Sequence, residues 1–303
     1  MWIDSVQQSK VLEISGLIDA LAAADRSAFV VPERLHHDVA CGEFLAMPAY
    51  SASYLGLKIV TVSPRNAGSA IPTVQASYQL FSARTGALLA IMDGTALTLW
   101  RTAGVAALAA GRLASRSPDH ILIVGTGALA PFLVTAFATS FPDAAIALWG
   151  RRFEAAEAAA RAAGRRAAAI RELEVACRQA DIICCATSST QPLVRGDWLK
   201  DGAHLSLNGG FTPSMHEADS GAFRDALVAV DTNAAMRTAG ELLAALRAGS
   251  VRKADVITLQ SLLAEERSGP EIPRRTVFKS VGSAENDLIA AEYLWRRMAL
   301  SSA

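Results

Sequence analysis

The sequence predicts an α/β protein in which a mixed α+β domain precedes a doubly wound parallel sheet. Two observations support this prediction. From about residue 114 to residue 269, short apolar β runs alternate with alanine-rich helical runs, as in parallel strands joined by crossover helices. About the first 100 residues instead place short strands, separated by turn signals, after one helix, which is typical of an α+β domain.

In the first part, apolar residues on one face predict a helix over 14–24. Turn signals at Pro64-Arg65-Asn66, Gly68 and Thr85-Gly86 then separate short strands. These strands are predicted over 43–46, 57–62, 73–82 and 88–92. A long helix over about 95–114 leads into the second part.

In the second part, the strands are predicted over 120–124, 145–149, 166–170, 181–186, 204–207 and 227–230. The helices between them are predicted over 128–140, 153–163, 172–178 and 238–248, with Gly164 ending the second one. A last helix over 287–298 needs an apolar partner, so we expect it to pack on the first domain. The predicted domains are therefore 1–114 joined by the C-terminal helix 285–303, and 115–284.

A glycine turn follows the first strand of the second part. The run ILIVGTGALA places Gly125, Thr126 and Gly127 after the strand and Ala130 in the helix that follows. In the dinucleotide-binding turn of the Rossmann fold, the first glycine permits the tight corner and the second lets the backbone approach a pyrophosphate. The helix N-terminus, with Ala128 and Leu129 before it, offers unpaired N–H groups to the phosphates. A purely structural corner is the alternative interpretation.

The next strand ends in Gly150-Arg151-Arg152. This position, about 20 residues after the turn, carries an acid in sites selective for NAD. Arg151 and Arg152 instead suit a 2′-phosphate, which guanidinium groups bind by paired hydrogen bonds. NADP(H) is therefore the expected cofactor, with NAD(H) as the second option. Alternatively, both arginines are surface charges paired with Glu154 and Glu157.

The composition sets the class of protein. The chain has 303 residues, 51% of them hydrophobic, and 29 basic residues balance 29 acidic ones, so no net field indicates nucleic acid or an anionic membrane as a partner. The N-terminus has no cationic segment before an apolar core, and we expect a cytoplasmic location. The four cysteines and five histidines lack metal-ligand spacing, and no metal site is expected.

Three cations in the first part stand in unusual places. Arg34 follows Pro32 in a loop, Lys58 lies in the apolar strand GLKIV, and Arg101 lies in an apolar helical segment. Buried cations are costly without a partner, so Lys58 and Arg101 suggest a pocket for a ligand carboxylate. The alternative is that Lys58 faces solvent and Arg101 extends from the helix surface to water.

Motifs in one order along nearly the whole chain strengthen the functional interpretation. They are Pro32-Glu33-Arg34, Gly56-Leu57-Lys58, Pro64-Arg65-Asn66 with Gly68 and Pro72, the run TGALLAIMDG over 85–94, LTLWRT over 97–102, the glycine turn, Gly240-Glu241, and TVFKSVG over 276–282 with Asp287. This pattern resembles the ornithine cyclodeaminase/mu-crystallin family.

The resemblance implies a Rossmann domain joined to an α+β dimerisation and substrate domain, in a homodimer. It implies that Arg34, Lys58 and Arg101 hold a substrate carboxylate. It places the nicotinamide near Thr187-Ser188 and Val281-Gly282. Loop conformations around Met47, Trp100 and Phe211 set the shape of the substrate pocket, and periodicity does not fix them. Family members transfer hydride to or from amino acids, cyclic imines or opine-like imines.

One position departs from the family pattern. Cyclodeaminases carry GGDxPGKxE after the fifth main strand, and its Asp assists chemistry at the amine. Here the loop reads Asn208-Gly209-Gly210-Phe211, with Phe211 in the place of the acid. Phenylalanine cannot transfer a proton, and removing a general base typically costs about 10²–10⁴-fold in rate. Glu217 and Asp219 are nearby in the sequence and could substitute for the missing acid, but Glu217 matches the glutamate of the family pattern.

These observations predict an NADP(H)-dependent reductase of a small cyclic or α-imino acid, in which Lys58 donates the proton. The enzymatic alternatives are an ornithine cyclodeaminase, which would form proline and ammonia, and an amino-acid dehydrogenase. An alternative of another class is a protein that binds NADP(H) and a small ligand without turnover.

Overall fold

The computed structural model describes residues 1–66, 69–114, 117–164, 167–264 and 275–301. Gly68, in a predicted turn, and Arg166, in a predicted strand, lie outside this set. The chain folds into two compact units, which we call unit 1 (Met1–Arg101 with Ser283–Ala303) and unit 2 (Thr102–Gly282). The division falls at Arg101, within helix α3 (Gly94–Leu113), rather than after residue 114.

Unit 1 is built on a sheet with the strand order β1-β6-β5-β4-β3-β2. The strands are β1 (Trp2–Ile3), β2 (Leu35–Val39), β3 (Gly42–Tyr50), β4 (Tyr54–Val62), β5 (Val74–Ser82) and β6 (Leu88–Asp93). Neighbours are antiparallel except β1 and β6. In β3 and β4 buried and half-exposed residues alternate, so one face of the sheet packs against the core.

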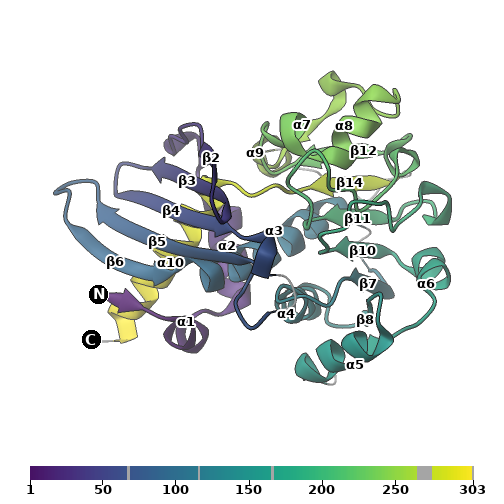
Figure 1. The fold of residues 1–303 in the computed structure, drawn as a ribbon, viewed down its shortest axis with the longest axis horizontal. Coiled ribbons are helices and arrows are strands. Elements are labelled where there is room, and N and C mark those ends of the chain that lie inside the picture. The colour runs from purple at the N-terminus through teal and green to yellow at the C-terminus, as the bar shows by residue number, and fades with distance from the viewer. Residues whose placement is uncertain (67–68, 115–116, 165–166, 265–274, 302–303) are drawn as a thin grey trace. The chain divides into compact units, whose positions relative to one another are not determined.

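The C-terminal helix α10 (Ala284–Ser301) packs on this buried face, and α1 (Ser5–Val11) and α2 (Ile14–Ala23) pack on α10. Helix α10 contacts β3, β4, β5 and α2, and Figure 1 shows it along the sheet. The expectation that the last helix packs on the first domain is confirmed. It brings the far end of the chain under β4, where Lys58 lies.

Unit 2 contains a parallel sheet with the order β13-β12-β14-β11-β10-β7-β8-β9. Its strands are β7 (His120–Val124), β8 (Ala145–Trp149), β9 (Ala167–Ala169), β10 (Ile182–Cys185), β11 (His204–Leu207), β12 (Leu227–Val230), β13 (Ile257–Thr258) and β14 (Thr276–Lys279). The chain runs outward from β7 through β8 to β9 and then returns to β10 on the other side of β7. This reversal is the switch point at which doubly wound sheets bind ligands.

The helices of unit 2 connect these strands (Figure 1). They are α4 (Ala130–Ser140), α5 (Phe153–Ala162), α6 (Leu173–Gln179), α7 (Ala235–Thr238), α8 (Gly240–Arg247) and α9 (Leu259–Ala264). No described helix is both long enough and apolar enough to span a membrane. The predicted doubly wound α/β fold is confirmed, and the strands predicted over 120–124, 145–149, 204–207 and 227–230 have the observed bounds.

Some elements differ from the prediction. Strand β14 lies between β11 and β12 but was not predicted, because its four residues begin with Thr276 and end with Lys279. Both side chains are buried and find partners far away in the sequence. Strand β2 was also missed, because its residues are all exposed and lack an apolar face.

Candidate functional site

Lys58 and Arg101 meet a third residue, Asp287. Lys58 Nζ lies 2.7 Å from Asp287 Oδ2, and Arg101 Nε donates to Oδ1 at 2.7 Å. The three residues come from β4, α3 and α10, and all belong to unit 1. Lys58 is 3% exposed, Arg101 5% and Asp287 0%. The alternative that both cations reach solvent is therefore wrong.

The local sequence explains how Lys58 reaches this position. Strand β4 alternates, so that Lys58 shares its buried face with Gly56, Val60 and Val62. A Cβ on Gly56 would lie 1.9 Å from the hydroxyl oxygen of Tyr78. Glycine two residues before the lysine thus leaves room for the Tyr78 ring.

Burial and the neighbouring charges alter the protonation of Lys58 and of Asp287. Burial, reinforced by the positive charges of Arg101 and Arg34 and opposed by Asp287, lowers the pKa of Lys58 to about 8. Burial opposes ionisation of Asp287, but Lys58 and Arg101 outweigh it and hold the pKa of that carboxyl below its usual value. Lys58 can thus exchange its proton near neutral pH, while Asp287 stays charged.

The other residues predicted for substrate binding are divided between the units. Met47 is buried and faces Lys58 in the pairing of β3 with β4. Arg34 is half-buried just before β2, close enough for its charge to act on Lys58. Phe211 belongs to unit 2, where it packs half-buried against the hydrophobic core.

Asp287 is part of the sequence motif, but the motif alone assigns it no role. An acid in the first turn of a helix is common, because its negative charge interacts favourably with the positive end of the helix dipole. What marks Asp287 is its complete burial, and only the fold reveals that. The one signal in the sequence is indirect, namely the need of two buried cations for an internal anion.

In unit 2, the glycine turn joins β7 to α4. Gly125 has φ +132°, and a Cβ there would lie 2.5 Å from the carbonyl oxygen of Ala186, so only glycine fits. At Gly127 a Cβ would meet nothing within 4 Å. The turn combines a tight corner with an open backbone, as a bound pyrophosphate requires.

The start of α4 places the positive end of a helix dipole beside this turn, which favours a phosphate. Leu129 at the N-cap makes no side-chain cap. The N–H of Ala130 donates to the carbonyl oxygen of Gly127 at 3.0 Å, and Pro131 has no N–H, so the helix start contributes its dipole rather than these two donors. Gly150, at the end of β8, lets the side chain of Thr126 approach, because a Cβ there would lie 2.5 Å from Thr126 Cγ2. These residues fit a dinucleotide.

Glu217 organises two loops at the same edge of the sheet. Its Oε1 accepts hydrogen bonds from the backbone N–H of Thr187 at 2.7 Å and from the Thr187 hydroxyl at 3.1 Å. Its Oε2 accepts from the N–H of Gly209 at 2.8 Å and of Gly210 at 3.4 Å. Glu217 thereby fixes the loop that follows β10 and the start of the loop that follows β11. The second of these loops leads directly into Phe211. Burial raises its pKa, although Lys279 opposes this effect.

Two further buried groups of unit 2 were not recognised from the sequence. Lys279 Nζ lies 2.7 Å from Glu241 Oε1 and 4.0 Å from Glu217 Oε2, and all three residues are 0% exposed. Asp231, just after β12, accepts from the N–H groups of Val281 at 3.0 Å and Gly282 at 2.7 Å. Asp231 thus shapes the turn predicted to lie near the nicotinamide.

The acids considered as substitutes for Phe211 already have structural partners. Glu217 is buried beneath its loops, and Asp219 accepts from the N–H groups of Gly196 and Ala222. These bonds support a structural role for both side chains.

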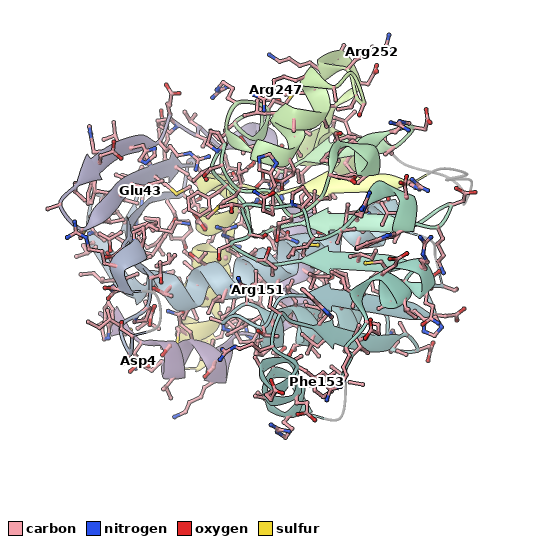
Figure 2. The ribbon with its side chains drawn as sticks, turned by 45° about the vertical axis from the view of Figure 1, so that its right-hand side comes forward. Asp4, Glu43, Arg151, Phe153, Arg247 and Arg252 are labelled. Carbon is pink, nitrogen blue, oxygen red and sulfur yellow. The ribbon has the colours of Figure 1, made fainter. Side chains whose placement is uncertain are left out.

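Arg151 and Arg152 are exposed between β8 and α5, and Figure 2 labels Arg151 near Phe153 at the start of the helix. The guanidinium of Arg171 lies 3.6 Å from the centre of the Phe153 ring, and such stacking orients an arginine. The end of β8 therefore carries positive charge from two neighbouring segments.

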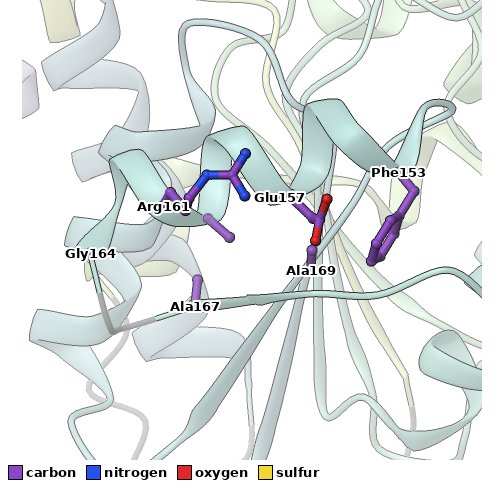
Figure 3. Close-up of a pocket in the computed structure, with 7 residues that line it drawn as sticks. Phe153, Glu157, Arg161, Gly164, Ala167 and Ala169 are labelled. Carbon is purple, nitrogen blue, oxygen red and sulfur yellow. The ribbon is translucent and has the colours of Figure 1, made fainter.

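A pocket between α5 and β9 adjoins this region (Figure 3). Its charged lining residues are Glu157 and Arg161, which stand one helical turn apart and offset each other's charge. The glycine turn does not line it. This pocket therefore offers no net attraction for a phosphate.

Fold and glycine turn together define a dinucleotide-binding α/β protein with a buried cation cluster in its other unit. The family model described as ornithine cyclodeaminase/mu-crystallin family matches residues 7–302. The chain belongs to this family, and the resemblance seen in the sequence is confirmed.

Relatives of known name agree with this assignment. The chain is 33% identical to ketimine reductase mu-crystallin of Mus musculus, over 88% of this chain and 82% of the mouse protein. It is 31% identical to a Delta(1)-pyrroline-2-carboxylate reductase of Colwellia psychrerythraea, over 98% and 99% of the two chains. Among solved structures, an archaeal alanine dehydrogenase dimer with bound NAD superposes with a TM-score of 0.91 at 26% identity, covering 100% of this chain and 97% of that one.

Replacing Glu217 tests the arrangement of the loops. Glu217→Gln presents an amide NH₂ to N–H donors and should destabilise the fold by about 1–3 kcal/mol, because buried donors lose their acceptor. Chemical denaturation measures this change. Glu154→Gln, at an exposed position of α5, is the control and should stay within about 0.5 kcal/mol of the wild type. Equal stability of both variants would contradict the role of Glu217.

Proposed function

We propose that this protein is an NAD(P)H-dependent reductase of a small imino acid, a cyclic ketimine such as a pyrroline or piperideine carboxylate. The observation that carries the proposal is the charge of the buried cluster. Lys58 and Arg101 contribute two positive charges and Asp287 contributes one negative charge, which leaves one positive charge in a buried place. The carboxylate of an imino acid supplies the missing anion.

The cluster has donors to spare for such a ligand. Arg101 uses Nε for Asp287, and a guanidinium carries four more N–H donors on its two terminal nitrogens. Those two nitrogens form the fork that binds a carboxylate in a bidentate manner. Arg34 adds positive charge nearby. Fixing the carboxylate in this way orients the imine carbon, and orientation can contribute about 7–11 kcal/mol to lowering the barrier.

Lys58 is the proton donor in this proposal. Reduction of an imine adds a hydride to carbon and a proton to nitrogen, and the bound dihydronicotinamide supplies the hydride. Lys58 Nζ supplies the proton, because its pKa of about 8 keeps it protonated near neutral pH and still lets it release that proton. Met47 provides an apolar wall for the ring of the substrate.

The cofactor is NADP(H) in preference to NAD(H). The pyrophosphate binds at the turn and helix start formed by Gly125, Thr126, Gly127, Ala128 and Leu129. Arg151 and Arg152 bind the 2′-phosphate. They directly precede Phe153, whose ring Arg171 contacts. The loops of Thr187-Ser188 and Val281-Gly282, which Glu217 and Asp231 hold in place, would hold the nicotinamide.

We also propose that the protein acts as a cytoplasmic homodimer. On β4 the side chains of Leu55, Leu57 and Ile59 lie on the sheet face opposite Lys58, where Leu55 is exposed and Leu57 and Ile59 are half-buried. A second copy would cover this apolar face, and the related alanine dehydrogenase is described as a dimer. Buried free cysteines such as Cys184 and Cys185 fit a reducing compartment.

The decisive experiment is NADPH oxidation with a panel of cyclic imino acids. Turnover that saturates with the imine supports the reductase. Tight binding of NADPH and of a carboxylate without turnover on any substrate would instead favour the non-catalytic binding protein, and the proposal would fail. Including alanine and proline with NADP⁺ tests the amino-acid dehydrogenase in the same assay.

The cofactor preference can be measured by titrating both nucleotides. NADPH should bind more tightly than NADH, and Arg151→Asp should narrow or reverse the ratio, because it replaces attraction for the 2′-phosphate with repulsion. Arg247→Asp, an equal charge change at an exposed position of α8, should leave the ratio unchanged. Equal affinity of the wild type for both nucleotides would contradict the proposed role of the two arginines.

The carboxylate site can be tested at Arg101. Arg101→Met should raise KM or abolish imine reduction while NADPH affinity stays nearly unchanged, since the nucleotide binds to unit 2. Arg112→Met changes an exposed arginine of the same helix and should behave like the wild type. Steady-state kinetics and nucleotide titration measure both effects. Unaltered kinetics of Arg101→Met on every substrate would rule out the site.

Ornithine distinguishes the reductase from a cyclodeaminase. With Phe211 in the loop and Glu217 committed to backbone N–H groups, neither of these two residues offers a free acid for chemistry at the amine. The wild type should therefore form little proline or ammonia from ornithine with catalytic NAD⁺ or NADP⁺ while it reduces cyclic imines readily. Assays of both products decide the question, and robust proline formation would favour the cyclodeaminase.

A further inference from the structure

Asp287 places a carboxylate beside Lys58 and Arg101, where the sequence predicted only the carboxylate of a ligand. Both of its oxygens are engaged, Oδ2 with Lys58 and Oδ1 with Arg101. The side chain is completely buried and belongs to the first turn of α10, while its two partners belong to β4 and α3. The carboxylate of Asp287 thus joins Lys58, the proposed proton donor, to Arg101, which is proposed to bind the substrate carboxylate.

We propose that Asp287 is a positioning residue that serves as the internal counter-ion of the site, fixing Lys58 and Arg101 and keeping Lys58 protonated for transfer to the imine nitrogen. This inference rests on the proposed reductase function. It assigns Asp287 a role in the proton step without contact between Asp287 and the substrate.

The geometry explains why an internal anion is needed. Two buried cations close to one carboxylate would repel each other in the absence of substrate, and burial alone disfavours the ammonium form of Lys58. Asp287 offsets both effects and also holds the two side chains in place before the substrate arrives. Because it neutralises only one of the two charges, the site keeps its attraction for an anionic substrate.

The proton step balances with these groups. The N–H bond of the Lys58 ammonium breaks and an N–H bond forms at the imine nitrogen, while the imine carbon receives the hydride. Lys58 is then neutral, Asp287 remains a carboxylate, and Lys58 recovers a proton from water. Asp287 favours this recovery, because the ammonium form is the one that it stabilises.

The groups that act on Lys58 are few. Asp287 on α10 raises its pKa, whereas Arg101 on α3 and Arg34 before β2 lower it. Tyr78, opposite Lys58 on β5, is buried and its pKa is raised well above the usual value, so it stays neutral through the relevant range. Changes at Asp287 and at Arg101 should therefore move the pKa of Lys58 in opposite directions.

The first measurement needs no substrate. The chain has five lysines, Lys10, Lys58, Lys200, Lys253 and Lys279, so NMR of the full protein with isotope-labelled lysine can follow Lys58, assigned with Lys58→Met. Asp287→Asn should lower its pKa from about 8 by roughly 1–3, and Arg101→Gln should raise it. Asp287→Glu, which keeps the charge, should restore most of the wild-type value, and Asp19→Asn on the exposed side of α2 should leave it unchanged.

The second measurement is the pH dependence of kcat/KM for imine reduction. Reduction needs protonated Lys58, so the rate should fall as the pH rises through its pKa. In Asp287→Asn the pKa of this basic limb should fall by the same amount as the Lys58 pKa measured by NMR. At a pH above both pKa values, a Lys58 pKa lower by about 1 leaves about one tenth of the protonated fraction. A purely structural role would lower the rate at every pH and leave the limb in place.

The outcomes separate the inference from the proposed function. An unchanged Lys58 titration in Asp287→Asn overturns the counter-ion role, as does a changed titration with an unmoved basic limb. If Asp287→Asn does not fold, an Arg101→Gln protein whose Lys58 pKa fails to rise overturns the charge coupling. A wild type that reduces no imine refutes the proposed function, whereas the Lys58 titration still decides whether Asp287 is its counter-ion.

Discussion

The ion network of Lys58, Asp287 and Arg101 is the constraint on which unit 1 depends. A buried carboxylate that loses one of its cations leaves an uncompensated charge, which typically costs about 3–5 kcal/mol. The network therefore links the C-terminal helix to β4 and α3 through a contact that is costly to break. Arg26 reinforces this attachment at the start of the same helix, through Glu285 at 3.1 Å and Asn286 at 2.9 Å.

Unit 2 uses buried carboxylates differently. Glu217 and Asp231 bind backbone N–H groups in the loops after β10, β11 and β14, where a doubly wound sheet binds its ligand. Satisfied buried hydrogen bonds order such loops, and broken ones are costly. In unit 1 a carboxylate balances cations, whereas in unit 2 carboxylates set the shape of the loops.

Two kinds of feature could be predicted from the sequence. They are segments whose residues all suit one element, and single residues whose charge conflicts with the apolar element around them. Buried parallel strands are almost continuously apolar, so β7 and β8 were visible from the sequence. Lys58 and Arg101 stood out because a cation on an apolar element requires a partner. Asp287 did not stand out, because its partner Arg101 is 186 residues away and its own helix turn favours an acid. Strand β14 was hidden for the same reason, since Lys279 is neutralised by Glu241 of a distant helix.

The central claim, that the protein delivers hydride to the carbon of a small imino acid, can be tested by isotope transfer. The wild type would be given a cyclic imino acid such as Delta(1)-pyrroline-2-carboxylate and NADPH deuterated at nicotinamide C4, one face at a time. For one of the two faces, mass spectrometry of the product should find one deuterium on the α-carbon of the cyclic amino acid. Product without deuterium from either labelled cofactor, or the absence of product, would contradict the account.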